Sequence, residues 1–382
     1  MTALRGSSAI VGVGLAGIPQ MPPGSTPVDC MALAASAALA DAGIAPEEVD
    51  GVFASGLQML MPALGLVEYL GLQPRHVDGT QVGGCAPLLQ LNHARAAIAM
   101  GLCSVALIAY GSTQRSSGAA FASLSEPQVF EADLGWPGPI AAYALIAQRH
   151  MHEFGTRRED LAEVAVAARK WAQLTPGASA QAPLTIDDVM SARRVATPLG
   201  VRDCCLVTDG GGALVVVSAE RARSMRRPVY VLGGAEHVSH RSIAAVPDLT
   251  RTAATLTGAR AFAEAGLRPA DVDVLQLYDA FTINPIIFLE DLGFCAKGEG
   301  GAFVRNGALA PGGRLPVNTN GGGLSFCHPG MYGMFTLIES VLQLRGGLGA
   351  RQVADARVAL AHAPGGFMAS QATVLLGTAD TL

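Results

Sequence analysis

Four segments of this 382-residue sequence place cysteine, histidine or tyrosine beside glycine, and each could contribute to catalysis. In the first segment, Cys85 follows two glycines and precedes an apolar helix that is expected to begin near Leu88. The positive end of a helix dipole and its free N–H groups stabilise a thiolate, which is the nucleophilic form of cysteine. Cys85 is therefore a candidate nucleophile, and the alternative is a buried structural cysteine, a common use of that residue.

The second segment is a glycine-rich loop, residues 318–333, which delivers Cys327 and His328 to the start of another predicted helix. A histidine at a helix N-terminus tends to stay neutral, and this suits a hydrogen-bonding role or a general base. Tyr332 follows His328 by four residues, so both would lie on one helix face. The alternative for His328 is a structural role in capping the loop.

The remaining two segments follow predicted strands. Tyr278 ends a strand, where ligands of α/β sheets are bound, and it could donate a proton or bind a carbonyl oxygen. His362 follows the strand 358–361 and precedes two glycines, whose N–H groups could stabilise a developing oxyanion. An ordinary strand-end tyrosine and a lone structural histidine are the alternatives. The glycines predicted to bind the substrate or its oxyanion are Gly322, Gly323, Gly365 and Gly366.

Composition limits the classes of protein to consider. Half of the residues are hydrophobic, 15% are charged and 46 are glycine, as expected for buried α/β sheets with tight turns. The net charge is -5 without a basic tract, so nucleic acid is not an expected partner. Apolar stretches are interrupted before they reach a membrane-spanning length. Seven irregularly spaced cysteines without a CxxC pair predict reduced thiols in the cytoplasm and no metal site.

An internal duplication predicts how these segments are brought together. Residues 38–50 and 261–273 are identical at seven of thirteen positions, and each is an alanine-rich helix that ends at glycine. Each half then continues as a βαβαβ unit. We therefore expect an N-terminal half, residues 1–222, and a C-terminal half, residues 223–382. Residues 112–200 have no equally long counterpart, which indicates an inserted lid over a site or, alternatively, a dimer-contact loop.

Together these segments resemble the thiolase superfamily, and most closely its sterol-carrier-protein-X and lipid-transfer-protein-like branch. Cys85 matches the family's nucleophile at a helix start, whereas a shift of one residue would place Gly84 there. His328-Pro329 matches the family's histidine, and residues 362–366 match its C-terminal glycine motif. The branch's His-Asp-Cys-Phe motif reads Tyr-Asp-Ala-Phe at residues 278–281, so the cysteine that the branch uses as acid/base is absent.

The resemblance implies an α/β fold of five layers, αβαβα, built from the two duplicated halves and usually dimeric. It implies an acyl-coenzyme A (CoA) substrate, with CoA as substrate or product and no other cofactor. In relatives with tyrosines around the site it also implies a small partner subunit with a zinc ribbon and an OB-fold.

Three functions follow as hypotheses. The first is an acyltransferase that thiolyses a 3-ketoacyl-CoA, with Cys85 as nucleophile and His362 or Cys327 moving protons. The second is a retro-aldolase that cleaves a bulky β-hydroxyacyl-CoA, such as one with a steroid side chain, and uses Tyr278 or Tyr332 to take the hydroxyl proton. The third is a non-catalytic subunit that binds acyl-CoA or lipid.

Overall fold

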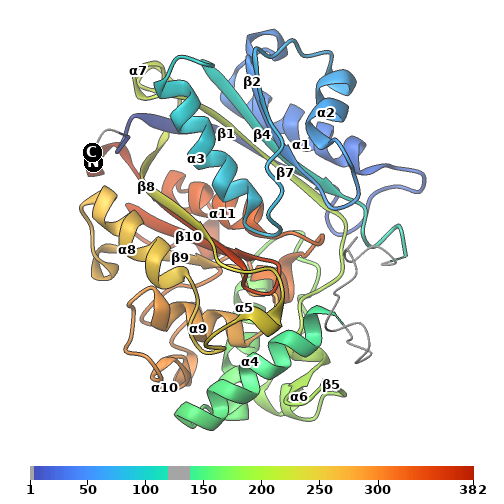
Figure 1. The fold of residues 1–382 in the computed structure, drawn as a ribbon, viewed down its shortest axis with the longest axis vertical. Helices are drawn as coiled ribbons and strands as arrows, with labels where there is room; N and C mark the ends of the chain where they lie inside the picture. Colours follow the sequence, from blue (N-terminus) through green and yellow to red (C-terminus); the bar gives the residue numbers. More distant parts are fainter. Residues whose placement is uncertain (1–3, 119–137) are drawn as a thin grey trace.

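The computed structural model describes residues 4–118 and 138–382, and its centre is a mixed sheet of nine strands (Figure 1). The strands are β1 (Ser8–Ala16), β2 (Gly51–Ser55), β3 (His76–Asp78), β4 (Val105–Ser112), β7 (Gly210–Ser218), β8 (Val229–Val238), β9 (Val274–Leu277), β10 (Val358–Gly365) and β11 (Ser370–Gly377). Two short strands, β5 (Arg194–Ala196) and β6 (Leu199–Gly200), form a separate hairpin.

The two halves of the sheet repeat one topology. Outward from the middle, the first half runs β1-β7-β4-β2 and the second β8-β11-β10-β9. In both halves the first two of these pairings are antiparallel and the last is parallel. β3 adds a further parallel strand at the edge of the first half. Only two residue pairs join β1 to β8, so the sheet is continuous through a narrow contact between the halves.

Helices lie in three layers around and between the two halves of the sheet. Helices α3 and α11 pack against strands of both halves and against each other, whereas α1 covers the first half from outside and α8 covers the second (Figure 1). The predicted order αβαβα is therefore confirmed. The helices are α1 (Pro27–Ala42), α2 (Pro62–Leu70), α3 (Ala86–Ala99), α4 (Pro139–Phe154), α5 (Arg158–Gln173), α6 (Ile186–Met190), α7 (Ala219–Ala222), α8 (Ala254–Ala265), α9 (Ile283–Asp291), α10 (Gly300–Phe303) and α11 (Gly333–Arg345).

The repeated sequence forms the same local structure twice. Helices α1 and α8 end at Gly43 and Gly266, which have φ values of +64° and +65°. This left-handed conformation is accessible to glycine without the steric cost that other residues incur, and it explains why both copies keep glycine at the helix end. Each copy continues into a short 3₁₀ turn that begins with proline and leads into the next strand.

The predicted insertion contains α4, α5, α6 and the β5–β6 hairpin, while its residues 119–137 lie outside the described residues. Helices α4 and α5 contact α9, and α5 also contacts the loop that carries His328. The predicted boundary after residue 222 coincides with the end of α7, and the division into two domains stays a prediction. No helix among the described residues is long and apolar enough to cross a membrane.

Candidate active site

The ends of β9, α3 and α11 converge on the glycine-rich loop that precedes α11. Its residues Gly322–Phe326 form a single π-helical turn that wraps around the buried carboxylate of Asp279. Asp279 accepts hydrogen bonds from the N–H of Gly323 (2.6 Å) and, more weakly, of Leu324 (3.4 Å). A Cβ at Gly322 would lie 2.1 Å from the Asp279 carboxylate, and φ there is +64°, so the turn requires glycine. This turn sets the position of His328, two residues beyond it.

Tyr278 and His328 form the central contact of the site. The Tyr278 hydroxyl lies 2.8 Å from His328 Nε2, and both side chains are at least nine-tenths buried. The backbone N–H of His328 donates to the Thr208 hydroxyl at 3.0 Å, which holds the histidine from the first half of the chain. The Tyr278 hydroxyl has a second, longer contact of 3.4 Å with the carbonyl of Gly330. The structure thus brings the tyrosine that follows β9 into contact with the histidine of the glycine-rich loop.

Tyr332 lies on the other side of this pair, at the residue before α11 begins. Its ring centroid is 5.7 Å from that of Tyr278, and its ring is nearly parallel to the His328 imidazole. The Tyr332 hydroxyl donates to Asn320 Oδ1 at 2.9 Å, and the same oxygen accepts the N–H of Gly322. Asn320 thus fixes the direction of the tyrosine hydroxyl. Sequence reasoning did not single out Asn320, although an asparagine before three glycines is a recognisable turn signal.

Burial keeps this group of side chains uncharged. It lowers the pKa of His328 to about 4, so the imidazole is neutral at physiological pH. It also raises the pKa values of Tyr278 and Tyr332 well above 10. A neutral imidazole bonded to a phenol can pass a proton in either direction without placing a net charge in the buried site. The cluster is therefore equipped for proton transfer to and from a substrate oxygen or carbon.

Asp279 adds a carboxyl group whose state is sensitive to its surroundings. Burial raises its pKa to about 7, while the hydrogen bonds from Gly323 and Leu324 act in the opposite direction. The N–H groups of Gly322 and Gly323 are already bonded to Asn320 and Asp279. The expectation that these two glycines bind an oxyanion therefore needs correction, because in this structure they shape the loop instead.

Cys85 is at the start of α3, as expected, but the hydrogen-bond contacts of its thiol are with Ser370 and Val82. The residue is fully buried, its sulfur lies 3.1 Å from the Ser370 hydroxyl, and burial raises its pKa to about 12. Burial thus outweighs the helix dipole, and the thiol stays protonated. The preceding residue, Gly84, faces the site instead, because a Cβ there would lie 2.2 Å from Cε1 of Tyr278. Successive residues of a helix are rotated by about 100°, and this explains why Gly84 and Cys85 face different surroundings.

Cys327 and His362 also lie outside the hydrogen-bonded cluster. Cys327 is fully buried beside His328, and burial raises its pKa well above 9. His362 bonds Thr373 and Gln371 through its two ring nitrogens, and burial lowers its pKa to about 3. Its neighbours Ala361 and Ala363 pack in the core around α3 and α11, so the alternation of β10 turns His362 to the other face. The structure corrects the expectation that His362 moves protons here.

Gly365 ends β10 and Gly366 follows it, beside the residues that precede α3. A Cβ at Gly365 would lie 1.9 Å from the Val82 carbonyl oxygen, so glycine lets these two backbones approach. The N–H of Gly366 has no hydrogen-bond partner among residues 4–118 and 138–382. Gly366 therefore remains a candidate donor to a substrate oxygen, whereas Gly365 is needed for packing.

A cavity of about 640 Å³ lies beside α5 and α6, and three arginines line it: Arg169, Arg193 and Arg202. Arg169 donates to the Ser325 hydroxyl at 3.0 Å and so joins the cavity wall to the π-helical turn. Burial lowers the pKa of Arg169, and the nearby Arg202 lowers it further. Within the described part of the chain, Arg193 and Arg202 form no ion pair, so their charges are available to an anion.

Comparisons with known proteins identify the family of this chain. Residues 235–378 match the family model described as thiolase C-terminal domain-like. A 17-hydroxy-3-oxo-4-pregnene-20-carboxyl-CoA lyase of Mycobacterium tuberculosis is 37% identical, over 90% of this chain and 92% of its own length. An acetyl-CoA acetyltransferase of Methanothermobacter thermautotrophicus is 34% identical, over 88% and 91%. A solved Ltp2-ChsH2(DUF35) aldolase superposes with a TM-score of 0.89 at 32% identity, covering 98% of both chains.

The chain belongs to the thiolase superfamily, in its sterol-carrier-protein and lipid-transfer-like branch. It is an enzyme of acyl-CoA carbon–carbon bond chemistry, of the acyltransferase or retro-aldolase type.

Proposed function

We propose that this enzyme is a retro-aldolase that cleaves the bond between the α- and β-carbons of a β-hydroxyacyl-CoA. The observation that carries the proposal is that Gly84, which has no side chain, faces Tyr278 at the start of α3, whereas the thiol of Cys85 contacts Ser370. Among the described residues, the hydrogen bonds of the Tyr278 and Tyr332 hydroxyls are with imidazole, carbonyl and amide groups, and no thiol takes part in them. Aldol cleavage needs proton transfers and no covalent acyl-enzyme. The hydroxyl and imidazole groups of this cluster can carry out the proton transfers.

The geometry supports a separate role for each side chain of the cluster. The β-hydroxyl of the substrate gives its proton to Tyr278, whose own proton passes to His328 Nε2 across the 2.8 Å hydrogen bond. The electron pair of the O–H bond forms the carbonyl of a ketone, and the α–β bond breaks to leave the enolate of the shortened acyl-CoA. Tyr332, held by Asn320, is placed to protonate the α-carbon. Return of the proton from His328 to Tyr332 restores both side chains, and the products are a ketone and a shorter acyl-CoA.

The cavity beside α5 and α6 supplies a place for the phosphates of CoA. Three arginines, none of which forms an ion pair within the described residues, face a space with a single acidic neighbour, Asp188. Guanidinium groups bind phosphates through paired hydrogen bonds, and such charge-assisted bonds contribute about 1.5–3 kcal/mol each. The link from Arg169 to Ser325 connects this cavity to the loop that carries the catalytic histidine.

Neutralising Arg202 is expected to weaken binding of the CoA portion alone. For Arg202→Gln, we expect KM for an acyl-CoA substrate to rise about 10- to 100-fold, as loss of one charge-assisted bond implies. KM for the same acyl group on N-acetylcysteamine, which lacks the phosphates, should change less than about twofold by the same reasoning. Steady-state kinetics with both thioesters test whether Arg202 binds the CoA phosphates. An equal increase in both KM values would rule out this role.

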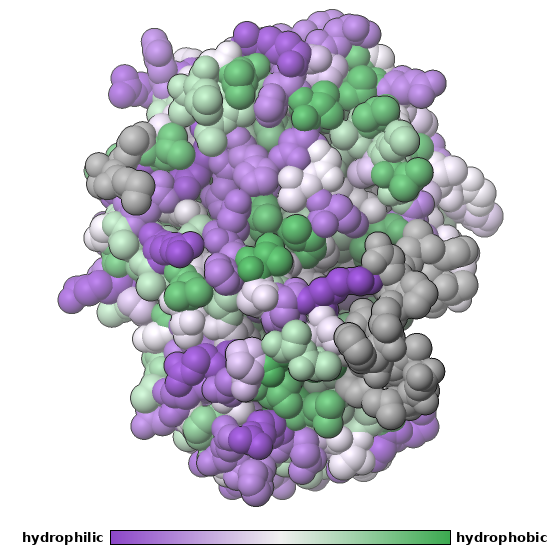
Figure 2. Space-filling view, viewed as in Figure 1, coloured by the Kyte–Doolittle hydropathy of each residue, from purple (hydrophilic) through white to green (hydrophobic). Residues whose placement is uncertain are grey.

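The partner and the assembly are proposed on separate grounds. The aldolase of similar structure pairs Ltp2 with ChsH2(DUF35), and we infer a comparable small subunit with a zinc ribbon and an OB-fold here. A homodimer would use the edge of the sheet at β3, because exposed edge strands readily pair with another chain. Leu60, Met61 and Leu64, at the start of α2, are exposed, and Figure 2 shows apolar residues around α2. The seven unpaired thiols fit a reducing cytoplasm.

Co-expression with the genomic neighbours of this gene tests the function directly. The purified complex should carry zinc in the partner and should release ketone and acyl-CoA from a β-hydroxyacyl-CoA without added CoA. Cys85→Ser should keep this activity, because its thiol lies outside the cluster. Cleavage of a 3-ketoacyl-CoA that requires free CoA and is lost in Cys85→Ser would instead establish thiolysis.

A further inference from the structure

Asn284 is a buried amide without partners in the first turn of α9. Its side chain is fully buried, yet neither Oδ1 nor Nδ2 has a hydrogen-bond partner among residues 4–118 and 138–382. Buried amides elsewhere in the second half, such as those of Asn320 and Gln371, are bonded. Because an unpaired buried amide destabilises the folded state, proteins rarely retain one unless a ligand or water completes it.

Polar groups from two other segments of the chain lie near Asn284. The hydroxyl of Tyr143, on α4, lies close enough to the Asn284 amide that the amide partly offsets the rise in the Tyr143 pKa, which burial causes. That hydroxyl has a long contact of 3.4 Å with the Gly366 carbonyl, and the N–H of Gly366 is unpaired in the described residues. Asn284, Tyr143 and Gly366 thus come from three elements that are distant in the sequence.

This group of three residues lies next to the catalytic tyrosine. The ring of Tyr143 stacks on Phe281 with centroids 4.4 Å apart, and Phe281 belongs to the same four-residue motif as Tyr278. Tyr143 is also close enough to Tyr278 to raise its pKa, after the larger effect of burial. On the other side, a Cβ at Gly83 would lie 2.8 Å from the nitrogen of Gly366, so the turn abuts the residues that lead to Gly84.

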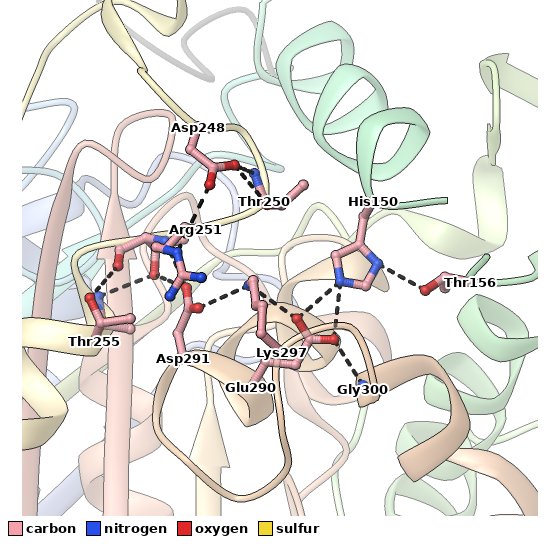
Figure 3. A network of polar contacts seen from close by, with 12 residues as sticks. His150, Thr156, Asp248, Thr250, Arg251, Thr255, Glu290, Asp291, Lys297 and Gly300 are labelled. Carbon is pink, nitrogen blue, oxygen red and sulfur yellow. Dashed lines mark hydrogen bonds and ion pairs between the residues drawn. The ribbon is translucent and has the colours of Figure 1, made fainter. Parts of the chain in front are cut away.

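A buried ionic network fixes the two helices that carry Tyr143 and Asn284. His150, two turns after Tyr143 on α4, contacts both carboxylate oxygens of Glu290 on α9 at 3.1 Å (Figure 3). Glu290 also pairs with Lys297 and accepts the N–H of Gly300. The carboxylate and the imidazole are completely buried, so α4 cannot shift from α9 without breaking this network. Asn284 therefore faces Tyr143 in a rigid setting.

We propose that Asn284 and Tyr143 bind a carbonyl or hydroxyl oxygen on the acyl group of the substrate, separate from the β-hydroxyl that is cleaved. This inference rests on the proposed function and specifies its substrate class as an acyl group that carries a further oxygen near the reacting carbons. An amide offers both a donor and an acceptor, and so recognises either form of oxygen. A site whose polar groups would be left unpaired discriminates strongly against a hydrocarbon in the same position.

The test uses binding, so that it does not depend on cleavage. Cyclohexylacetyl-CoA and (2-oxocyclohexyl)acetyl-CoA share a skeleton, differ by one ketone oxygen next to the β-carbon and lack the β-hydroxyl. We expect calorimetry with the full chain and its partner to show tighter binding of the ketone, by about 10- to 100-fold. Asn284→Leu should bind both compounds equally and melt at the same or a higher temperature, because an apolar isostere removes the unpaired amide. Tyr143→Phe should lose part of the preference.

The outcomes separate this inference from the proposed function. Equal binding of the two compounds by the unmodified enzyme, or an unchanged preference in Asn284→Leu, overturns the inference and assigns the amide to a bound water or to structure alone. Aldol cleavage that persists in either case leaves the proposed function standing. A ketone preference that depends on Asn284, in an enzyme without aldolase activity, would support the site while the proposed reaction fails.

Discussion

Tyr278→Phe is expected to lower kcat for aldol cleavage by about 10²–10⁴-fold, the range typical for loss of a general acid or base. The change removes only the hydroxyl that lies 2.8 Å from His328 Nε2, and it keeps the ring that packs against Gly84. Binding of the acyl-CoA should therefore persist, with KM altered less than about threefold on the view that the hydroxyl acts mainly in the transition state. Ketone release measured under saturating substrate gives kcat directly.

Two comparisons make this prediction specific. Tyr332→Phe removes the hydroxyl held by Asn320, and it should slow protonation of the α-carbon while still allowing carbon–carbon cleavage in the first turnover. Cys85→Ser, a substitution of similar size at the start of α3, should behave like the unmodified enzyme. Normal rates in both tyrosine variants would exclude the retro-aldolase mechanism described above. Since the pKa of His328 is near 4, the step should not require its protonation at neutral pH.

The sequence predicted the fold because its signals are local and occur twice. Residues 38–50 and their copy at 261–273 each contain the end of a helix, a left-handed glycine and a 3₁₀ turn, and a pattern repeated at that length is hard to obtain by chance. A duplicated βαβαβ unit leaves few ways to bury both faces of each sheet. The order of the layers could therefore be predicted from the duplication. The meeting of Tyr278 with His328 followed from the same topology, since both lie at element ends of the second half.

The sequence could not determine which way individual side chains point. Cys85 and Gly84 are adjacent, and only the position of α3 relative to β9 shows that Gly84 faces Tyr278. The environment of His362 depends on the face of β10 that it occupies and on Thr373 and Gln371 of the neighbouring strand. Such facts depend on packing between distant segments, for which one residue of register changes the outcome completely.

The packing of Tyr278 against Gly84 depends on the absence of a side chain at residue 84. A Cβ there would lie 2.2 Å from Cε1 and 3.0 Å from Cζ of Tyr278, and 2.7 Å from the carbonyl oxygen of Pro364. None of these contacts can be relieved by rotating a flexible side-chain end. Two of them are with a buried aromatic ring, and the third is with a backbone carbonyl. Either Tyr278 moves away from His328 or the start of α3 shifts.

Gly84→Ala is therefore expected to reduce kcat/KM for aldol cleavage by about 10²–10³-fold, because displacement of a catalytic group by 1 Å has effects of this size. Overpacking should also lower the free energy of unfolding by about 1–3 kcal/mol, measurable by urea denaturation. The double variant Gly84→Ala/Tyr278→Phe distinguishes the cause. If the alanine acts by displacing the tyrosine hydroxyl, the double variant should be little slower than Tyr278→Phe alone. Fully additive losses would mean that Gly84 serves the reaction in another way, such as admitting the substrate.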